Sequence, residues 1–218
     1  MLVFLLFLFS FQAKSPIDEA KLPQTAATVR EFVPAGWTVE AEVGGDLNRD
    51  SISDFAVVLV EQMPASADKE NPPERQRALL ILLKTTDGKF SRAGLATKLL
   101  LCTRCGGAFY GIVETPVTIE ITNGVLIVRQ EYGSRELTQE TYRFRYEPES
   151  KRFLWIGSDL RGYDRLTGET QTESTNFLTG VKLTTASKAN EKTGKDVVVA
   201  NKSQRVSRAK KYLEDVVA

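Results

Sequence analysis

The sequence contains no histidine among its 218 residues. The chain therefore has no Ser-His or Cys-His nucleophilic pair, no H-E-x-x-H zinc site and no imidazole for acid–base catalysis. The remaining acid–base option is a pair of carboxylates, as in glycoside hydrolysis. Four glutamates are candidates, although their spacing does not place any two of them across a cleft: Glu114, Glu120, Glu131 and Glu140. We expect a non-catalytic protein, with a secreted carboxylate-dependent hydrolase as the alternative.

Net charge is almost absent, because 29 Lys and Arg residues are balanced by 28 Asp and Glu residues. Without a positive field, composition gives no argument for a nucleic-acid partner. The chain is 42% hydrophobic and 26% charged, which is ordinary for a soluble globular protein. Its length favours one domain with a sizeable core.

A long apolar run occurs only at the start of the chain. Residues 1–12 are too few to span a bilayer as a helix, but they are typical of the apolar core of a secretory signal peptide. No Lys or Arg precedes them. We predict a signal peptide over residues 1–15, a mature protein that begins near Lys14 to Pro16, and an exported location, periplasmic or secreted. The mature form is expected to have no stable membrane span.

Most of the remaining chain has the patterns of β-strands. Residues 37–43 alternate with period 2, whereas residues 55–60 and 78–83 are continuous apolar runs typical of buried strands. Asn123-Gly124, between two alternating segments, is the clearest hairpin signal. Further strand pairs are indicated at 141–146 with 153–157 and at 172–178 with 181–185. The predicted fold class is mainly β.

We expect a single antiparallel β domain over residues 16–187, with a short N-terminal helix at residues 22–32. Pro23 suits the first turn of that helix. Apolar side chains recur on one side of it: Ala26, Val29 and Phe32.

The tail, residues 188–218, is polar and rich in Lys and Arg. Residues 204–217 have the spacing of a C-terminal helix, and Ser203 suits its N-cap. We expect such a helix to dock weakly or to fray at the chain end.

Asp46, Asn48, Asp50 and Asp54 stand at positions 1, 3, 5 and 9 of a polar loop, and Ile52 at position 7 offers its carbonyl. This alternation suits Ca²⁺, because a loop that wraps an ion turns every second residue inward. Oxygen ligands without Cys or His favour Ca²⁺ over zinc. Serine replaces glycine at position 6 and valine replaces glutamate at position 12, so the loop is not an EF-hand. We expect weak binding, with a dissociation constant of about 10⁻⁴ to 10⁻³ M. The alternative is an Asx-rich turn without a metal.

The loop from Gly45 to Asp54, followed by an apolar strand, resembles the calcium loop of FG-GAP/VCBS-type repeats. Residues 33–185 resemble a family of small exported bacterial proteins that carry one such loop. Three further motifs contribute to the resemblance: Cys102-x-x-Cys105-Gly106-Gly107, Tyr142-Arg143-Phe144-Arg145-Tyr146 and Asn176-Phe177-Leu178-Thr179. The resemblance implies Ca²⁺ ligation by the Asp and Asn side chains of the loop, and it implies no activity. Ser51 departs from the usual glycine.

Cys102 and Cys105 are the two cysteines of the chain. In an oxidising compartment a local disulfide is the expected state. A C-x-x-C thiol-redox protein is the alternative, although Gly106-Gly107 follows the pair where a helix N-terminus would stabilise a thiolate. A reduced, inert pair is a further alternative. Half of a zinc ribbon is another, and its second cysteine pair would have to come from a second chain that shares the metal.

The expected partner is an unidentified envelope protein or a glycan. Four aromatic residues could form the binding surface or pack in the core: Tyr142, Tyr146, Trp155 and Tyr163. We therefore predict an exported, non-catalytic, Ca²⁺-stabilised β domain of the cell envelope with a structural or binding role.

Overall fold

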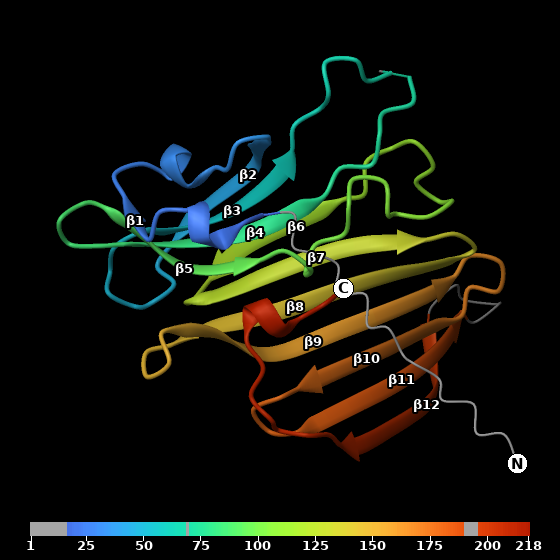
Figure 1. Cartoon of the computed structure of the whole chain (residues 1–218). Helices are drawn as coiled ribbons and strands as arrows, with labels where there is room; N and C mark the ends of the chain where they lie inside the picture. Colours follow the sequence, from blue (N-terminus) through green and yellow to red (C-terminus); the bar gives the residue numbers. More distant parts are fainter. Residues whose placement is uncertain (1–16, 69, 190–195) are drawn as a thin grey trace, which may run out of the picture.

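Two antiparallel sheets form the fold (Figure 1). The computed structural model describes residues 17–68, 70–189 and 196–218, so the predicted signal peptide lies outside the described residues. One sheet has five strands in the order β1-β5-β4-β3-β2, and the other has seven in the order β12-β11-β10-β9-β8-β7-β6. Most neighbouring strands are consecutive in the sequence, as hairpins require. The prediction of a mainly β, antiparallel fold is confirmed.

The five-stranded sheet contains β1 (Thr25–Ala26), β2 (Trp37–Gly45), β3 (Asp54–Glu61), β4 (Arg77–Lys84) and β5 (Phe90–Ala96). The seven-stranded sheet contains β6 (Val117–Thr122), β7 (Val125–Gly133), β8 (Glu136–Glu147), β9 (Arg152–Asp164), β10 (Thr170–Asn176), β11 (Val181–Ala189) and β12 (Asp196–Arg205). Three short 3₁₀ helices are η1 (Glu19–Lys21), η2 (Val29–Phe32) and η3 (Leu213–Asp215).

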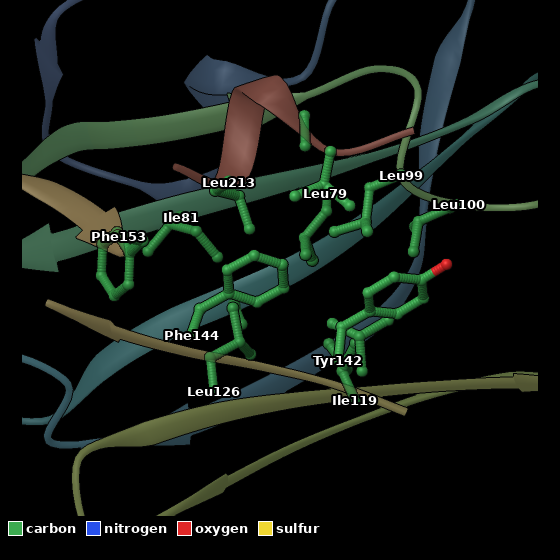
Figure 2. Close-up of a cluster of buried hydrophobic side chains, with 14 of the residues drawn as sticks. Leu79, Ile81, Leu99, Leu100, Ile119, Leu126, Tyr142, Phe144, Phe153 and Leu213 are labelled. Atoms are coloured by element: carbon green, nitrogen blue, oxygen red, sulfur yellow. The ribbon is translucent and has the colours of Figure 1, made fainter. Parts of the chain in front are cut away.

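The main core lies between the two sheets (Figure 2). Val58, Leu79 and Ile81 of the five-stranded sheet belong to one buried cluster with Leu126 and Phe144 of the seven-stranded sheet. The sheets approach each other closely at one edge, where a Cβ on Gly45 would lie 2.6 Å from the Ile121 side chain. Glycine at that position therefore permits the contact between β2 and β6.

Strands β3 and β4 are covered on both faces, which explains their continuous apolar runs. Val58 and Leu79 face the seven-stranded sheet, whereas Val57 and Leu80 belong to a second buried cluster on the opposite face. The N-terminal segment covers that second face, and its Phe32 is fully buried there. Burial of one such side chain contributes about 1.5 to 3 kcal/mol.

The predicted N-terminal helix is not present over residues 22–32. Residues 25–26 pair with β5 instead, and the chain then forms the single 3₁₀ turn η2. Pairing with the edge of β5 occupies backbone groups that an α-helix would need for itself. The spacing of Val29 and Phe32 also fits a 3₁₀ turn, in which residues three apart lie on one side.

The predicted C-terminal helix over residues 204–217 is also absent. The first two of these residues end β12, which pairs with β11. The chain then crosses β9, where Leu154 and Tyr212 form an isolated bridge, and reaches η3. Leu213 of η3 is fully buried in the core between the sheets (Figure 2). The apolar spacing correctly indicated that Leu213 and Val216 are buried. Contacts with distant strands nevertheless hold this segment in an extended conformation and not in a helix.

A carboxylate at the end of β8 holds this tail in place. Glu147 accepts hydrogen bonds from Lys210 Nζ at 2.5 Å and from Tyr212 Oη at 2.9 Å. Ser150 Oγ donates to it at 2.7 Å. The hydrogen bond from Lys210, with those from Ser150 and Tyr212, lowers the pKa of Glu147 from 4.5 to about 2.

Acidification should therefore release the tail. A carboxylate with a lowered pKa stabilises the fold above its unfolded pKa, and that contribution disappears as the pH falls through the folded pKa. We expect the tail contacts at full strength above pH 4.5 and progressively lost towards pH 2. Trp155 reports on this change, because its backbone N–H donates to Lys211 O at 2.9 Å and the Lys211 ammonium lies 5.8 Å from the centre of its ring. Its fluorescence should show an acid transition that Glu147→Gln lacks, and identical curves would contradict the account.

Candidate functional site

The Asp-rich loop between β2 and β3 is organised by its own polar side chains. Asp46 accepts hydrogen bonds from the N–H groups of Arg49 at 2.6 Å, Asp50 at 3.2 Å and Ser51 at 2.9 Å. Asn48 Nδ2 donates to Asp50 at 2.9 Å. Arg49 and Ser51 have φ angles of 66° and 70°, so the loop uses the left-handed region at two non-glycine residues.

Asp54 has a different environment from the other predicted ligands. Its side chain is fully buried, and its two oxygens accept from Leu47 N and Lys84 N, each at 2.9 Å. Burial raises the pKa of Asp54, while these two N–H groups oppose that shift. Asp54 therefore links the loop to the end of β4.

The loop residues fit a hard cation by their chemistry. Asp46, Asn48, Asp50 and Asp54 supply oxygens only, and Ile52 supplies a backbone carbonyl. A carboxylate oxygen has two lone pairs, so one N–H bond leaves capacity for an ion. Within the described residues, the loop carboxylates do not form a group whose ligand atoms all lie within 4.8 Å of one another. Binding would thus draw the side chains closer together.

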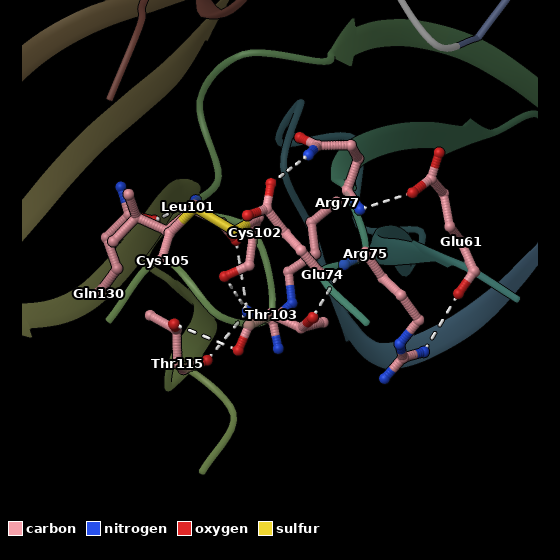
Figure 3. The surroundings of a disulfide bond; sticks show 11 residues. Glu61, Glu74, Arg75, Arg77, Leu101, Cys102, Thr103, Cys105, Thr115 and Gln130 are labelled. Carbon is pink, nitrogen blue, oxygen red and sulfur yellow. Dashed lines mark hydrogen bonds between the residues drawn. A yellow bond between two sulfur atoms is a disulfide. The ribbon is translucent and has the colours of Figure 1, made fainter. Parts of the chain in front are cut away.

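The loop between β5 and β6, residues 97–116, contains a disulfide between Cys102 and Cys105 and is called the cysteine loop (Figure 3). This confirms the predicted pairing. Gly107 has a φ of 74°, and a Cβ there would lie 2.6 Å from Gly133 O at the end of β7. Gly133 N donates to Gly106 O at 2.9 Å. The Gly-Gly pair therefore lets the loop pack directly against the β7–β8 turn.

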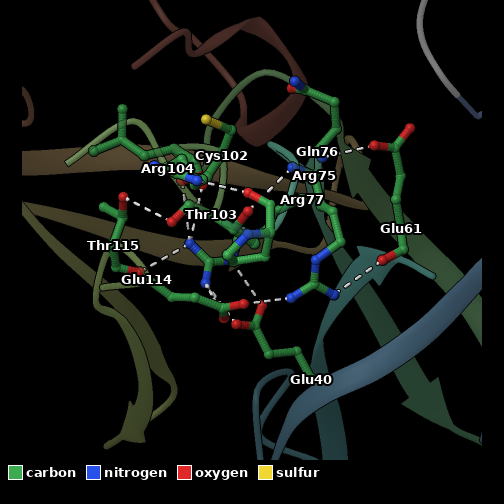
Figure 4. A network of polar contacts seen from close by, with 12 residues as sticks. Glu40, Glu61, Arg75, Gln76, Arg77, Cys102, Thr103, Arg104, Glu114 and Thr115 are labelled. Carbon is green, nitrogen blue, oxygen red and sulfur yellow. Dashed lines mark hydrogen bonds and ion pairs between the residues drawn. The ribbon is translucent and has the colours of Figure 1, made fainter. Parts of the chain in front are cut away.

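A buried arginine anchors the cysteine loop (Figure 4). The Arg77 side chain is 2% exposed. Its Nη1 donates to Thr115 O at 2.9 Å, Leu101 O at 3.3 Å and Cys102 O at 3.4 Å. Its Nε and Nη2 form a bidentate pair with Glu40 at 2.7 and 2.6 Å. Buried charge is tolerated only with such partners.

Glu40 reaches Arg77 because β2 contains a bulge. The register with β3 shifts between Val39 and Ala41, so Glu40 is an extra residue in the strand. The bulge also reverses the alternation of β2. Trp37 packs in the cluster beneath the N-terminal segment, whereas Ala41 packs against the core between the sheets.

A second contact fixes the cysteine loop beside β4. Thr103 N donates to Arg75 O at 3.0 Å, and Arg75 N donates to Thr103 Oγ1 at 3.0 Å. Thr115 N donates to Thr103 O at 2.8 Å. Thr103 and Thr115 are each 1% exposed. Together with Arg77, these bonds hold both ends of the loop (Figures 3 and 4).

Sequence reasoning did not identify Arg77, Glu40 or Thr103. Arg77 precedes the apolar run of β4 in the sequence, a position at which a charged residue is usually solvated. The sequence gives no signal of the bulge either, because Glu40 occupies a polar position in the period-2 alternation of residues 37–43.

The candidate catalytic carboxylates do not form a pair on β7 and β8. Glu131 lies opposite Gln139, and Gln130 lies opposite Glu140. Because cross-strand partners share a face, Glu131 and Glu140 point to opposite faces of the sheet.

Each of the four glutamates also has a partner of its own. Tyr110 Oη donates to Glu131, and Tyr142 Oη donates to Glu140 at 2.6 Å. Burial and contact with Glu131 raise the pKa of Tyr110 to about 12. The other two glutamates form ion pairs: Glu120 with Arg129 at 2.8 Å, and Glu114 with Arg75 at 2.5 Å.

The predicted aromatic surface is mostly core. Tyr142 is 7% exposed, and Tyr146 and Trp155 pack against the same cluster. Tyr163, on β9, is 40% exposed. Of the four aromatics, Tyr163 is the one with a substantially exposed ring.

Comparison of the chain with protein-family models, curated proteins and solved structures finds no match. Within residues 17–68, 70–189 and 196–218, no helix is both long and apolar enough to cross a membrane.

Replacing Arg77 should weaken the fold strongly. Arg77→Met removes the donor to Glu40 and to the carbonyls of Thr115 and Leu101, whereas Cys102 O still accepts from Cys105 N. Removal of one partner from a buried ion pair costs about 3 to 5 kcal/mol. We expect the lower end of that range, because the Glu40 side chain is 27% exposed. Urea unfolding measures the change. Arg129→Met is the matched control: its pair with Glu120 is 47% exposed on both sides, so this substitution should cost far less than Arg77→Met. Equal losses would contradict the anchoring role.

Proposed function

We propose that the protein is an exported, non-catalytic β domain of the cell envelope that Ca²⁺ stabilises and that binds another envelope component. The observation that carries the proposal is the loop of residues 46–54, whose five predicted ligands are all oxygen donors on a turn ordered by its own carboxylates. Ca²⁺ would be held by Asp46, Asn48, Asp50 and the Ile52 carbonyl, with Asp54 at the inner end.

The position of the loop supports a stabilising role for the ion. The loop joins β2 to β3, a strand with both faces buried, and Asp54 connects it to Lys84 N on β4, which is also covered on both faces. Asp46 and Asp50 bring two negative charges into one turn, and a cation would convert their repulsion into attraction. Ordering of this turn would therefore stabilise three adjacent strands.

Export is supported by two features of the chain. The apolar run of residues 1–12 is typical of a signal peptide, and Cys102 and Cys105 form a disulfide. Disulfides of this kind are retained in oxidising compartments.

A binding role is supported by the outer half of the seven-stranded sheet. Strands β10–β12 extend beyond the five-stranded sheet (Figure 1), and Leu183 and Val198 are 46% and 59% exposed there. Among the described strands β12 also ends the sheet order, so its outer edge would offer backbone groups for strand addition. Exposed aliphatic side chains beside a free edge favour a protein partner over a glycan.

Neither alternative function has comparable support. Glu131 and Glu140 point to opposite faces, which argues against their use as a hydrolase pair. The cysteine pair precedes Gly106-Gly107 and not a helix, so no helix dipole favours a thiolate.

Calcium at roughly 10 mM should raise the free energy of unfolding by about 1.4 to 2.7 kcal/mol for a dissociation constant of 10⁻⁴ to 10⁻³ M. Asp50→Asn preserves the size of the side chain and removes its charge, so it should abolish most of the shift. Asp87→Asn, in the exposed turn between β4 and β5, is the matched control and should keep the full shift. Denaturant unfolding with and without Ca²⁺ measures both. No shift in the unmodified protein, or an equal shift in Asp50→Asn, would contradict calcium binding by this loop.

A further inference from the structure

One cluster of metal-ligating side chains lies outside the Asp-rich loop. A Glu74 carboxylate oxygen and the two sulfurs of Cys102 and Cys105 all lie within 4.8 Å of one another (Figure 3). Among the described residues, no other group of three Cys, Asp or Glu side chains meets that limit. Cys105 and Glu74 are exposed and Cys102 is buried, so the cluster opens to solvent on one side.

Hydrogen bonds hold this arrangement in addition to the disulfide. Glu74 adjoins Arg75, whose N–H and carbonyl both bond to Thr103, the neighbour of Cys102. Arg77 holds the carbonyl of Cys102 itself at 3.4 Å. None of these contacts involves the sulfur–sulfur bond, so we infer that they would keep Glu74 beside the cysteines after reduction.

The carboxylate is also oriented. Gln76 Nε2 donates to Glu74 Oε1 at 3.0 Å, and among the described residues no donor bonds to the other oxygen. A hydrogen bond of this kind fixes a ligating carboxylate in metal sites. Arg104, between the two cysteines, donates to Asn71 Oδ1 at 2.6 Å and to Pro72 O at 2.7 Å, so its guanidinium is engaged away from the sulfurs.

We propose that reduction of the disulfide creates a Zn²⁺ site formed by Cys102, Cys105 and Glu74. Two thiolates and one carboxylate suit this borderline metal, and three protein ligands leave the fourth tetrahedral position to water. The site is distinct from the Asp-rich loop, whose oxygen-only donors suit Ca²⁺. Oxidation closes the site, because sulfurs bonded to each other are not thiolates.

The chemistry balances with a dithiol as reductant. The dithiol gives two electrons and two protons to the Cys102–Cys105 bond and becomes a disulfide itself, and two thiols form on the protein. Zn²⁺ then displaces the two thiol protons as the two metal–sulfur bonds form.

Co²⁺ titration of the purified protein tests the proposal, because thiolate-bound Co²⁺ has a charge-transfer absorption that oxygen-bound Co²⁺ lacks. A phosphine reductant opens the disulfide and is itself oxidised, with water supplying the oxygen of the phosphine oxide. We expect the reduced protein to bind one Co²⁺ with this absorption and Zn²⁺ to displace it. The oxidised protein should show no such band.

Glu74→Gln should weaken Co²⁺ binding by at least about 10-fold. Loss of a residue that only hydrogen-bonds to a metal ligand already lowers metal affinity by about 10-fold or more, and Glu74 is proposed as a ligand itself. Glu70→Gln, a nearby exposed glutamate outside the cluster, is the matched control and should bind as the unmodified protein does. A second readout needs no variant: Zn²⁺ should slow alkylation of both thiols in the reduced protein. Absence of the thiolate band, unchanged alkylation, or equal binding by Glu74→Gln and Glu70→Gln would overturn the proposal.

Discussion

A guanidinium buried at 2% exposure must have its donors satisfied, and this requirement shapes one end of the molecule. Arg77 meets it with a carboxylate from β2 and carbonyls from both ends of the cysteine loop. The Glu40 bulge, which brings that carboxylate into place, also reverses the alternation of β2. Arg77 therefore links two features of the fold. Its ion pair with Glu40 holds the bulge that sets which side chains of β2 face each side of the sheet, and its bonds to carbonyls fix the cysteine loop.

The two candidate sites lie at opposite ends of the β2–β3 hairpin. The Asp-rich loop closes the hairpin, whereas Arg77 lies opposite Val60 near its open end. Each site is held by hydrogen bonds to backbone groups, and each has ligand chemistry suited to a different cation: oxygen donors in the first, sulfur and one carboxylate in the second. The covered strands between them supply a rigid frame on which both loops are positioned.

Local patterns predicted the strands from β2 to β11, because alternation, apolar runs and Asn-Gly turns act over a few residues. They did not predict β12, which lies in the segment expected to be a polar tail. They failed where distant contacts decide the conformation. Leu213 is buried as its spacing suggested, yet in a 3₁₀ turn, because the tail is held against β9 and Glu147. The cysteine pairing was predictable from a spacing of three, whereas its contact with Glu74 depends on the pairing of Arg75 with Thr103, which no local signal reveals.

Amide hydrogen exchange at Thr103 and Thr115 in oxidised and reduced protein tests most directly whether Arg77 and the Arg75–Thr103 contact, and not the disulfide, hold the cysteine loop. Both amides donate to backbone carbonyls within this network. The account predicts that their protection persists after reduction, since their partners are unaffected by breaking the sulfur–sulfur bond. Loss of protection at both amides, with the β3 and β4 amides still protected, would contradict it.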